Sequence, residues 1–184
     1  MNADAIQRVS TAISDRLKLA LGPPANVFVG PPDDDQADQA NIVVFPYRLV
    51  ANQSLRNTER VLPPASADPH GEPTVYQSSL PLDIFYLLAP GIATSEPQFW
   101  LGKAIQELQR DPNLVGDAVD GDTIRLSLEP ATTDELSHIW ALFPNKNYRT
   151  SVVYLASPVW IDSIQSTRAT RVVDDRHRVG QGMV

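Results

Sequence analysis

Residues 76–89 read YQSSLPLDIFYLLA, a segment that starts polar and becomes a nearly continuous apolar run. Pro90 and Gly91 follow and close it. A short apolar run bounded by turn residues is typical of a strand that is buried on both faces. The segment therefore predicts a strand in the interior of the protein, and neighbouring segments should build a sheet around it.

Three longer segments around this strand also have strand character. Residues 41–50 (NIVVFPYRLV) are β-branched and aromatic, but Pro46 cannot donate a hydrogen bond to a neighbouring strand, which favours an edge strand or a bulge. Residues 123–128 (TIRLSL) alternate apolar and polar side chains, as a strand with one wet face does. Residues 148–161 are predicted as a further strand, bent at Pro158.

Three segments have the apolar periodicity of helices. The first covers residues 5–20, and the second runs from an N-cap at Ser95 to Asp111. The third opens on the capping-box pattern Thr132-x-x-Glu135. The order of elements predicts an α+β single domain in which about three helices pack on a mixed or antiparallel sheet.

We assign residues 1–162 to this domain and residues 163–184 to an extended C-terminal arm, because the arm has neither helical nor strand periodicity. The charged residues of the arm are Arg168, Arg171, Arg176, Arg178, Asp174 and Asp175. Four arginines against two aspartates give the arm a net charge of +2, which leaves 11 basic and 20 acidic residues, a net charge of −9, in the rest. A basic arm on an acidic body suggests contact with another protein or another copy of the chain.

Composition excludes several classes of protein. The 184 residues include no cysteine, which rules out disulfides, thiolate metal sites and cysteine nucleophiles. The net charge of −7 disfavours nucleic acid as the main partner, because phosphate binding requires a basic surface. No apolar run approaches the roughly 20 residues of a membrane span, and the charged N-terminus is unlike a secretory signal. We therefore expect a cytoplasmic protein without a membrane span.

An acidic, proline-flanked loop follows the short strand candidate at residues 26–29. Its aspartates Asp33, Asp34 and Asp35 could take part in acid–base chemistry if two of them were forced together in a dry site. Flanking prolines favour a hydrated loop instead. We predict that these three residues, together with Arg168, Arg171, Arg176 and Arg178, belong to protein interfaces.

Glu135 and His138 are the first candidates for chemistry. They lie three residues apart on a predicted helix and face the same way, and a pair of such motifs would build a carboxylate-bridged di-iron site. The chain has no second copy of the motif. A single copy favours a partly exposed helix residue over a metal ligand, and we expect no metal or cofactor.

A phosphate-loop spacing is the second candidate. Gly116 and Gly121 have the right separation, but Asp122 occupies the position of the lysine and would repel phosphate. No Gly-x-Ser-x-Gly motif of a serine hydrolase is present either. The sequence therefore predicts a protein that is not an enzyme.

Several segments carry a resemblance to a known family. They are NVFVGPPDDD (26–35), SLPLDIFYLLAP (79–90), FWLGKAIQELQRDPNLVG (99–116), IRLSLEPATTDELSHIWALF (124–143) and YRTSVVYLASPVWIDS (148–163). In this order they resemble the cap or tail-terminator proteins of phage-tail-like contractile injection systems. The most specific parts are Leu80-Pro81-Leu82-Asp83 and Leu128-Glu129-Pro130. The chain departs from the family in FPNKN (143–147), between the last helix and the last strand, and in its short tail.

The resemblance implies a structural protein without catalytic residues. It implies a homohexameric ring that closes the end of the inner tube and the sheath farthest from the baseplate and so fixes the particle length. The implied partners are other copies of the chain, the sheath protein and the inner tube protein. Assembly would take place in the cytoplasm, with release as part of an extracellular particle as an option.

Two alternatives remain open from the sequence. One is a phage neck or head-completion ring protein, which would contact DNA, and the other is a small metal-dependent hydrolase that uses Glu135 and His138. For the terminator, we expect that residues 150–161 or residues 41–50 offer a sheet edge to a neighbouring strand.

Overall fold

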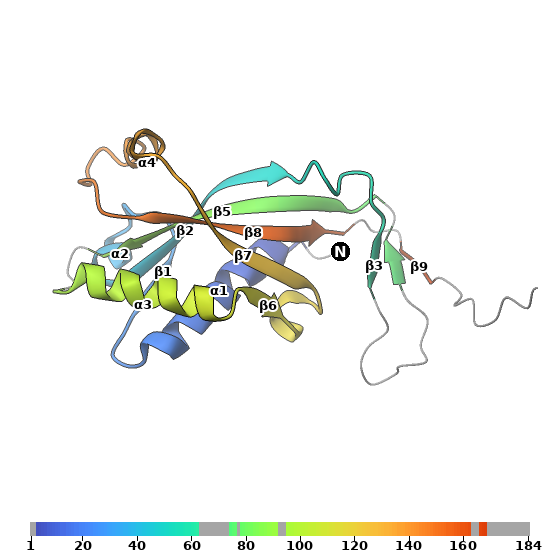
Figure 1. Cartoon of the computed structure of the whole chain (residues 1–184), viewed down its shortest axis with the longest axis horizontal. Coiled ribbons are helices and arrows are strands. Elements are labelled where there is room, and N and C mark those ends of the chain that lie inside the picture. Colours follow the sequence, from blue (N-terminus) through green and yellow to red (C-terminus); the bar gives the residue numbers. More distant parts are fainter. Residues whose placement is uncertain (1–2, 63–73, 77, 92–94, 163–165, 169–184) are drawn as a thin grey trace, which may run out of the picture.

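A six-stranded sheet forms the middle of the molecule, and helices lie against both of its faces (Figure 1). The structure is a computed structural model that describes residues 3–62, 74–76, 78–91, 95–162 and 166–168. In sheet order the strands are β1 (Val27–Val29), β2 (Ile42–Ala51), β5 (Leu80–Pro90), β8 (Val152–Ile161), β7 (Thr123–Glu129) and β6 (Asn113–Val115). β1 and β2 are parallel, and the other neighbours in this sheet are antiparallel. The predicted α+β fold with a mixed sheet is confirmed.

Strand β5 is the apolar strand that the sequence indicated. It lies between β2 and β8 and pairs with both over most of its length. Successive side chains of a strand point to opposite faces of the sheet, and here both faces are covered at one end. Tyr86, Leu87, Leu88 and Ala89 are consequently all buried. The strand begins at Leu80, four residues later than the quoted segment.

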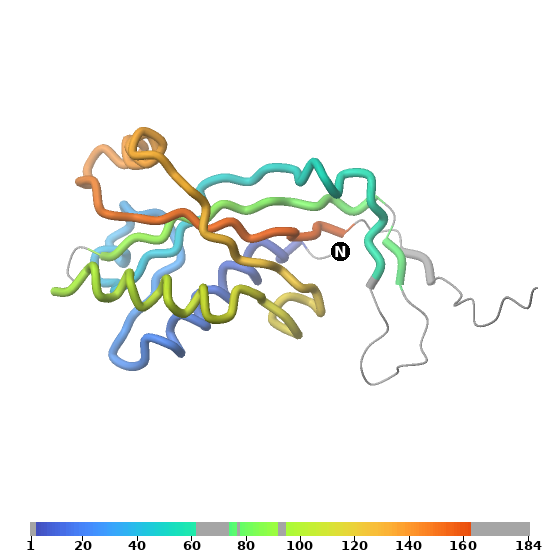
Figure 2. Tube along the Cα trace, viewed as in Figure 1, coloured from blue at the N-terminus to red at the C-terminus, as the bar shows by residue number. Residues whose placement is uncertain are grey.

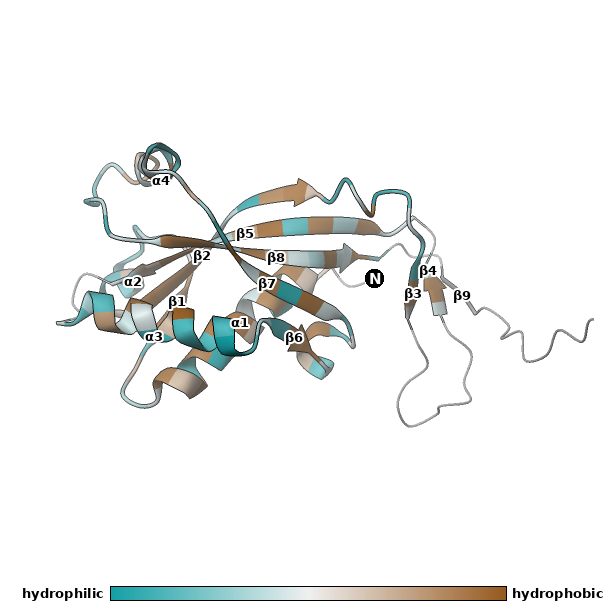
Figure 3. Cartoon of the chain, viewed as in Figure 1, coloured by the Kyte–Doolittle hydropathy of each residue, from teal (hydrophilic) through white to brown (hydrophobic). Residues whose placement is uncertain are grey.

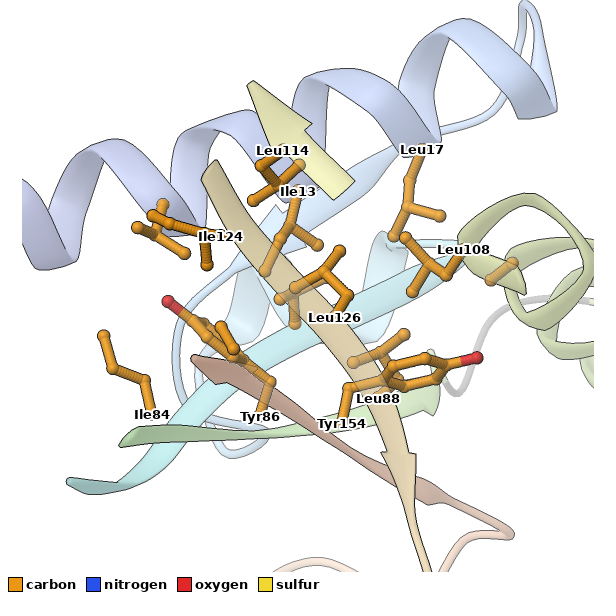
Figure 4. Close-up of a cluster of buried hydrophobic side chains, with 14 of the residues drawn as sticks. Ile13, Leu17, Ile84, Tyr86, Leu88, Leu108, Leu114, Ile124, Leu126 and Tyr154 are labelled. Carbon is orange, nitrogen blue, oxygen red and sulfur yellow. The ribbon is translucent and has the colours of Figure 1, made fainter. Parts of the chain in front are cut away.

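Helices α1 (Ala5–Leu21) and α3 (Pro97–Arg110) cover the first face of the sheet. Figure 4 shows Ile13 and Leu17 of α1 and Leu108 of α3 directed toward Leu126 and the strands beneath. Tyr86 reaches the same layer, and its hydroxyl lies 2.9 Å from Ser10 Oγ. Full burial of a Leu or Ile side chain contributes about 1.5–3 kcal/mol, so this layer provides most of the driving force for folding.

Helix α4 (Thr133–Trp140) covers only one end of the second face. Its buried residues Leu136, Ile139 and Trp140 pack against Leu87 and Val153. The Trp140 Nε1–H donates to Ser151 Oγ at 3.1 Å, so the polar end of the buried indole has a partner. The alternation of strand β7, visible as bands of colour in Figure 3, places Ile124 and Leu126 on the first face.

Two short helices were not predicted. α2 (Asp35–Gln39) forms at the end of the acidic segment that the sequence indicated as a loop, and a 3₁₀ turn, η1 (Asp117–Val119), follows β6. The start of α3 also differs, because its N-cap is Glu96 rather than Ser95 and makes no side-chain capping bond. Within the described residues, no helix is long and apolar enough to cross a membrane.

Strand β2 has both of the features expected from Pro46. Its pairing with β5 shifts register between Pro46 and Arg48, which marks a bulge. β1 pairs only with residues 42–44, so in the described part of the chain residues 45–51 form an open edge. The Val44 carbonyl accepts from Gly30 N–H, and Pro46 follows two residues later. Residues two apart in a strand direct their backbone groups to the same side, so the Pro46 nitrogen faces the side where β2 has no described neighbour beyond residue 44. A missing N–H there costs no hydrogen bond.

Strand β8 is an interior strand. It pairs with β5 on one side and, over residues 153–157, with β7 on the other. The expectation of a sheet edge is therefore wrong for residues 153–157, since both of their sides are occupied, whereas residues 159–161 pair only with β5 in the described part of the chain. The strand begins at Val152, later than residue 148 of the predicted segment.

Strands of a second, three-stranded sheet project from one end of the molecule, where Figure 2 shows β3 (Arg60–Leu62) and β4 (Thr74–Tyr76) side by side. The third strand is β9 (Ser166–Arg168), and β4 is the middle strand of this antiparallel sheet. The sequence indicated no strand at β3 or at β9, which lies in the predicted arm. The remainder of that arm, residues 163–165 and 169–184, lies outside the described residues.

Candidate interaction surfaces

Glu135 serves as a helix cap. Its carboxylate accepts hydrogen bonds from Thr132 N–H at 2.8 Å and from Thr132 Oγ1–H at 2.9 Å, while Thr132 Oγ1 accepts from Glu135 N–H at 3.2 Å. This is the predicted capping box. The bonds from Thr132 lower the pKa of Glu135. A carboxylate held in this way is ionised at neutral pH, and its hydrogen bonds are made to the N-cap residue of its own helix.

His138 does not complete a metal site with Glu135. Its side chain is 77% exposed, and its Nδ1 lies 3.8 Å from Asp134 Oδ2. His138 and Glu135 border a surface groove of about 300 Å³ together with Glu129. In the part of the chain that the structure describes, no group of three or more His, Asp or Glu residues is placed to hold a metal ion. The geometry gives the metal-dependent hydrolase no support.

Asp122, which stands in place of a phosphate-loop lysine, has a structural partner. Its Oδ2 accepts a hydrogen bond from Arg60 Nη2 at 2.7 Å. Arg60 Nη1 also donates to Asp162 Oδ1, and Ser79 Oγ donates to the same oxygen at 3.3 Å. The Arg60 side chain is only 3% exposed, and those of Asp122 and Asp162 are 12% and 7% exposed. We call these four residues the Arg60 network.

The Arg60 network joins the two sheets. Arg60 is the first residue of β3, Asp122 immediately precedes β7, and Asp162 immediately follows β8. Burial disfavours the charged guanidinium, but the bonds to Asp162 and Asp122 outweigh this and raise the pKa of Arg60. For the Asp122 carboxyl, burial raises the pKa, and this effect exceeds the opposing effect of Arg60. A buried ion pair of this kind fixes a geometry more than it adds stability.

No periodicity or motif in the sequence predicted the Arg60 network. Arg60 lies in a proline-rich connection where a charged residue is expected to be exposed. Its two carboxylate partners are 62 and 102 residues away along the chain. The only local sign was Asp122 at the place of a lysine, which marked that residue as unusual without naming its partner.

The predicted acidic residues differ in their surroundings. Asp33 and Asp35 are exposed. Asp34 is the N-cap of α2, and its Oδ1 accepts from Gln36 N–H at 2.8 Å. Next to them, Asp38 accepts two hydrogen bonds from Lys146 Nζ, at 2.8 and 2.7 Å. Two of the three predicted carboxylates are therefore fully available to a partner.

Of the predicted arginines, only Arg168 lies in the described residues. It is the last residue of β9, and its backbone is in register with Thr74 of β4. Arg171, Arg176 and Arg178 lie outside the described residues. The acidic segment and β9 are at opposite ends of the long axis of the molecule (Figure 1), so a single copy does not bring them together.

The outer face of α3 carries an aromatic pair that the sequence analysis treated only as helix periodicity. The rings of Phe99 and Trp100 meet edge to face with centroids 5.4 Å apart. Lys103 Nζ lies 5.3 and 5.9 Å from the two ring centroids. Phe99 is 51% exposed. Trp100 is partly buried and packs against the core. An exposed aromatic side chain such as Phe99 beside a cation is typical of protein interfaces, and this face is a further candidate surface.

Comparison with known proteins identifies a family and a fold. The family model described as the Pvc16 N-terminal domain matches residues 8–175. A solved sheath/tube terminator of the extracellular contractile injection system PVC, in the extended state, matches 100% of this chain with a TM-score of 0.61 and 18% identity. The tube-terminating cap of the anti-feeding prophage matches 93% with a TM-score of 0.60 and 20% identity.

These matches have defined limits. The chain spans 66% and 60% of the lengths of the two matched chains, which is less than two thirds of each. At 18% and 20% identity the likeness establishes the shared fold. A search of curated protein sequences found no match.

Proposed function

The chain belongs to the Pvc16 N-terminal domain family, and from this premise we propose that it caps the tube and sheath of a contractile injection system. The observation that most supports this function is the fold shared with two solved terminators over 100% and 93% of the chain. In this proposal six copies form a ring on the tube end farthest from the baseplate. The ring stops polymerisation and fixes the particle length.

The proposed role is structural and not enzymatic. The two solved structures with this fold are described as a sheath/tube terminator and a tube-terminating cap. The carboxylate of Glu135, the main catalytic candidate, caps helix α4. The partners in this proposal are other copies of the chain, the inner tube protein and the sheath protein. Assembly takes place in the cytoplasm, before any release of the particle.

Opposite charges at the two ends of the molecule support a head-to-tail ring contact. Such a ring needs two different and complementary patches on each copy. Exposed Asp33 and Asp35 lie at one end, and β9 with Arg168 lies at the other (Figure 1). In the proposed ring, the acidic end of one copy faces the basic residues 163–184 of the next. Ring closure then makes the last contact intramolecular, so each contact can be weak.

The open edge of β2 is the proposed site for a strand of a sheath subunit. Residues 45–51 lack a neighbour on one side in the described part of the chain. Backbone groups on such an edge can pair with an added strand, and the exposed side chains of Arg48 and Leu49 would contribute selectivity. This site is distinct from both ends of the proposed ring contact.

The length of the particles tests the function. Deleting the gene should give tubes and sheaths of uncontrolled length with open far ends, and the wild-type gene should restore one length. Length distributions in electron micrographs measure this. Normal, sealed particles in the deletion strain would contradict the proposal.

Charge reversal tests the ring contact separately. We expect Asp33→Lys with Asp35→Lys to prevent ring formation in native mass spectrometry, and added Arg168→Glu with Arg171→Glu to restore it. The matched control is Asp15→Lys with Asp134→Lys, which makes the same charge change at exposed positions elsewhere. Loss of rings in the control, or no rescue by the second pair, would contradict a contact through these charges.

A further inference from the structure

A cavity of about 370 Å³ lies where the end of β5, the first turn of α3 and the connection before β8 meet. Its walls include Pro90, Pro97, Leu101, Lys146, Arg149 and Thr150. We call it the Arg149 cavity. Neither the predicted interface residues nor the open edge of β2 lines it. Its volume is near the lower limit for ligand pockets in proteins and suits one or two amino-acid residues.

Arg149 brings a positive charge into this cavity without a carboxylate of its own. Its Nη1 donates to the Pro90 carbonyl at 2.8 Å and its Nη2 to the Pro32 carbonyl at 3.2 Å. Its Nε is buried without a hydrogen-bond partner, and the guanidinium carbon lies 5.0 Å from the Trp140 ring centroid. Among the described residues, no carboxylate oxygen lies within 4.0 Å of the guanidinium. Half-buried charges are normally paired.

The nearest acidic residue is already occupied. Asp38 accepts both of its short hydrogen bonds from Lys146, so the charge of Lys146 is neutralised and that of Arg149 is not. The three side chains together leave one net positive charge at the cavity. Burial lowers the pKa of Arg149, and Asp38 opposes this effect from a distance. An arginine nevertheless stays protonated at neutral pH, so the site presents a positive charge to an anion from outside.

The first turn of α3 adds to this preference for an anion. Its N-cap Glu96 makes no side-chain capping bond and Pro97 occupies the first turn, so within the described residues the free N–H groups of the helix start have no bond from the N-cap carboxylate. These groups give the N-terminus of a 14-residue helix a partial positive charge. In a chain with a net charge of −7, the cavity combines a helix start with an unpaired guanidinium.

The other walls are mixed, with polar Gln98, Asn145, Asn147 and Thr150, and their apolar part narrows the choice of anion. Pro90, Pro97 and Leu101 flank the cationic groups, and a fully hydrated inorganic ion would leave these surfaces uncovered. A carboxylate joined to an apolar residue fits both parts, since the guanidinium donates hydrogen bonds to the carboxylate while the apolar side chain covers the prolines and the leucine. Residues 145–147, from the FPNKN connection in which the sequence departs from its family, complete the wall.

We propose that the Arg149 cavity binds a carboxylate-bearing peptide segment of a neighbouring subunit in the particle. Arg149 and the first turn of α3 hold the carboxylate, and the apolar wall holds the adjoining side chain. The choice of a particle subunit as the partner rests on the proposed function. The binding chemistry does not rest on it.

Titration of the purified full-length chain with small probes tests the site. The probes are N-acetyl-Leu-Leu with a free C-terminal carboxylate, the same dipeptide as its amide, and N-acetyl-Leu-Glu-amide, whose only carboxylate is in the side chain. The Arg149 Nε–H signal and the amide signals of Gln98 and Leu101 in NMR spectra report binding. We expect saturable shifts with the first or third probe, which distinguishes a terminal from a side-chain carboxylate, and none with the amide.

Variants and a control anion make the test decisive. Arg149→Met should weaken binding about tenfold or more, because a charge-assisted bidentate contact is lost, whereas the exposed Arg125→Met on β7 should leave it unchanged. Thr150→Glu, at an exposed position of the rim, places a carboxylate at the cavity and should block the probes even if Arg149→Met fails to fold. Equal binding of acetate and the dipeptide, or no binding at all, would overturn the proposal. Neither result would affect the particle-length experiment.

Discussion

The two sheets of this protein are held in place by different forces. The six-stranded sheet lies between helices, and its position is fixed by many buried apolar side chains on both faces. The three-stranded sheet has strands of three residues each, too short to bury a core of their own. Among the described contacts, the buried polar link between this sheet and the body is the Arg60 network.

Because of this difference, the residues that stabilise the body are not the residues that orient the three-stranded sheet. Apolar burial is non-directional and distributed over many residues, so it stabilises the body without fixing one contact. A buried guanidinium with two carboxylates is directional, and substitution of Arg60 removes the counterion that both carboxylates share. The projecting sheet can therefore lose its orientation while the body stays folded, and the variants below test that separation.

The largest effect should come from the body. Tyr86→Ala removes a fully buried ring and its contact with Ser10, and we expect a loss of about 3–5 kcal/mol in the free energy of unfolding. Urea denaturation followed by far-UV circular dichroism measures it. Leu19→Ala is the control, because this leucine is 86% exposed and should change stability by less than about 0.5 kcal/mol. Similar losses in both variants would contradict the assignment of the core.

An intermediate and local effect should come from Arg60→Met. We expect a cost of about 3 kcal/mol, at the low end for breaking a buried ion pair, because the projecting sheet can move and let water reach Asp122 and Asp162. Hydrogen exchange should speed up at β3 and β4 and stay slow at β5. Adding Asp122→Asn and Asp162→Asn should recover part of the loss, since the carboxylates no longer lack a counterion. Uniformly faster exchange in all strands would show that the two sheets are not separable.

The smallest effect should come from an exposed polar contact. Thr132→Ala removes the N-cap of α4 and should cost about 1 kcal/mol. The bonds to Thr132 lower the pKa of Glu135 below its ordinary value, so the carboxylate contributes stability at neutral pH and loses that contribution as the pH falls through the lowered pKa. The difference between wild type and Thr132→Ala should therefore shrink in urea titrations as the pH falls through the lowered pKa of Glu135. A difference that grows on acidification would contradict the capping geometry.

The sequence was informative where periodicity extends over several turns or alternations. The opening helix, strand β5, strand β7 and the capping box of α4 all have enough residues for a pattern to emerge. The three-residue strands β3, β4 and β9 do not, because their pairing is decided by distant segments. The interior position of β8 also depends on which strands flank it, and its own sequence cannot specify that.

The candidate surfaces follow the same division. Exposure of Asp33 and Asp35 agrees with an acidic loop flanked by prolines, whereas the cap formed by Asp34 depends on a helix that the sequence did not predict. The Arg149 cavity brings residues 90, 91, 97, 98 and 101 together with residues of the segment 145–150, which is far from them in the chain. Arg149 alone gives no sign of lacking a carboxylate, since that property depends on Asp38 being bound to Lys146.

Pro46 has a consequence for the behaviour of the protein before it reaches its place in an assembly. Unprotected sheet margins recruit strands of almost any sequence and seed fibrous deposits. Pro46 interrupts the row of N–H donors on this margin. The register shift beside it bends the strand next to Arg48, whose side chain adds a positive charge. A strand that adds here lacks one hydrogen bond and has to follow a local bend, so pairing with an unrelated strand gains little free energy. Newly made chains should therefore stay dispersed at high concentration until they meet a partner whose strand fits the proline and the bend.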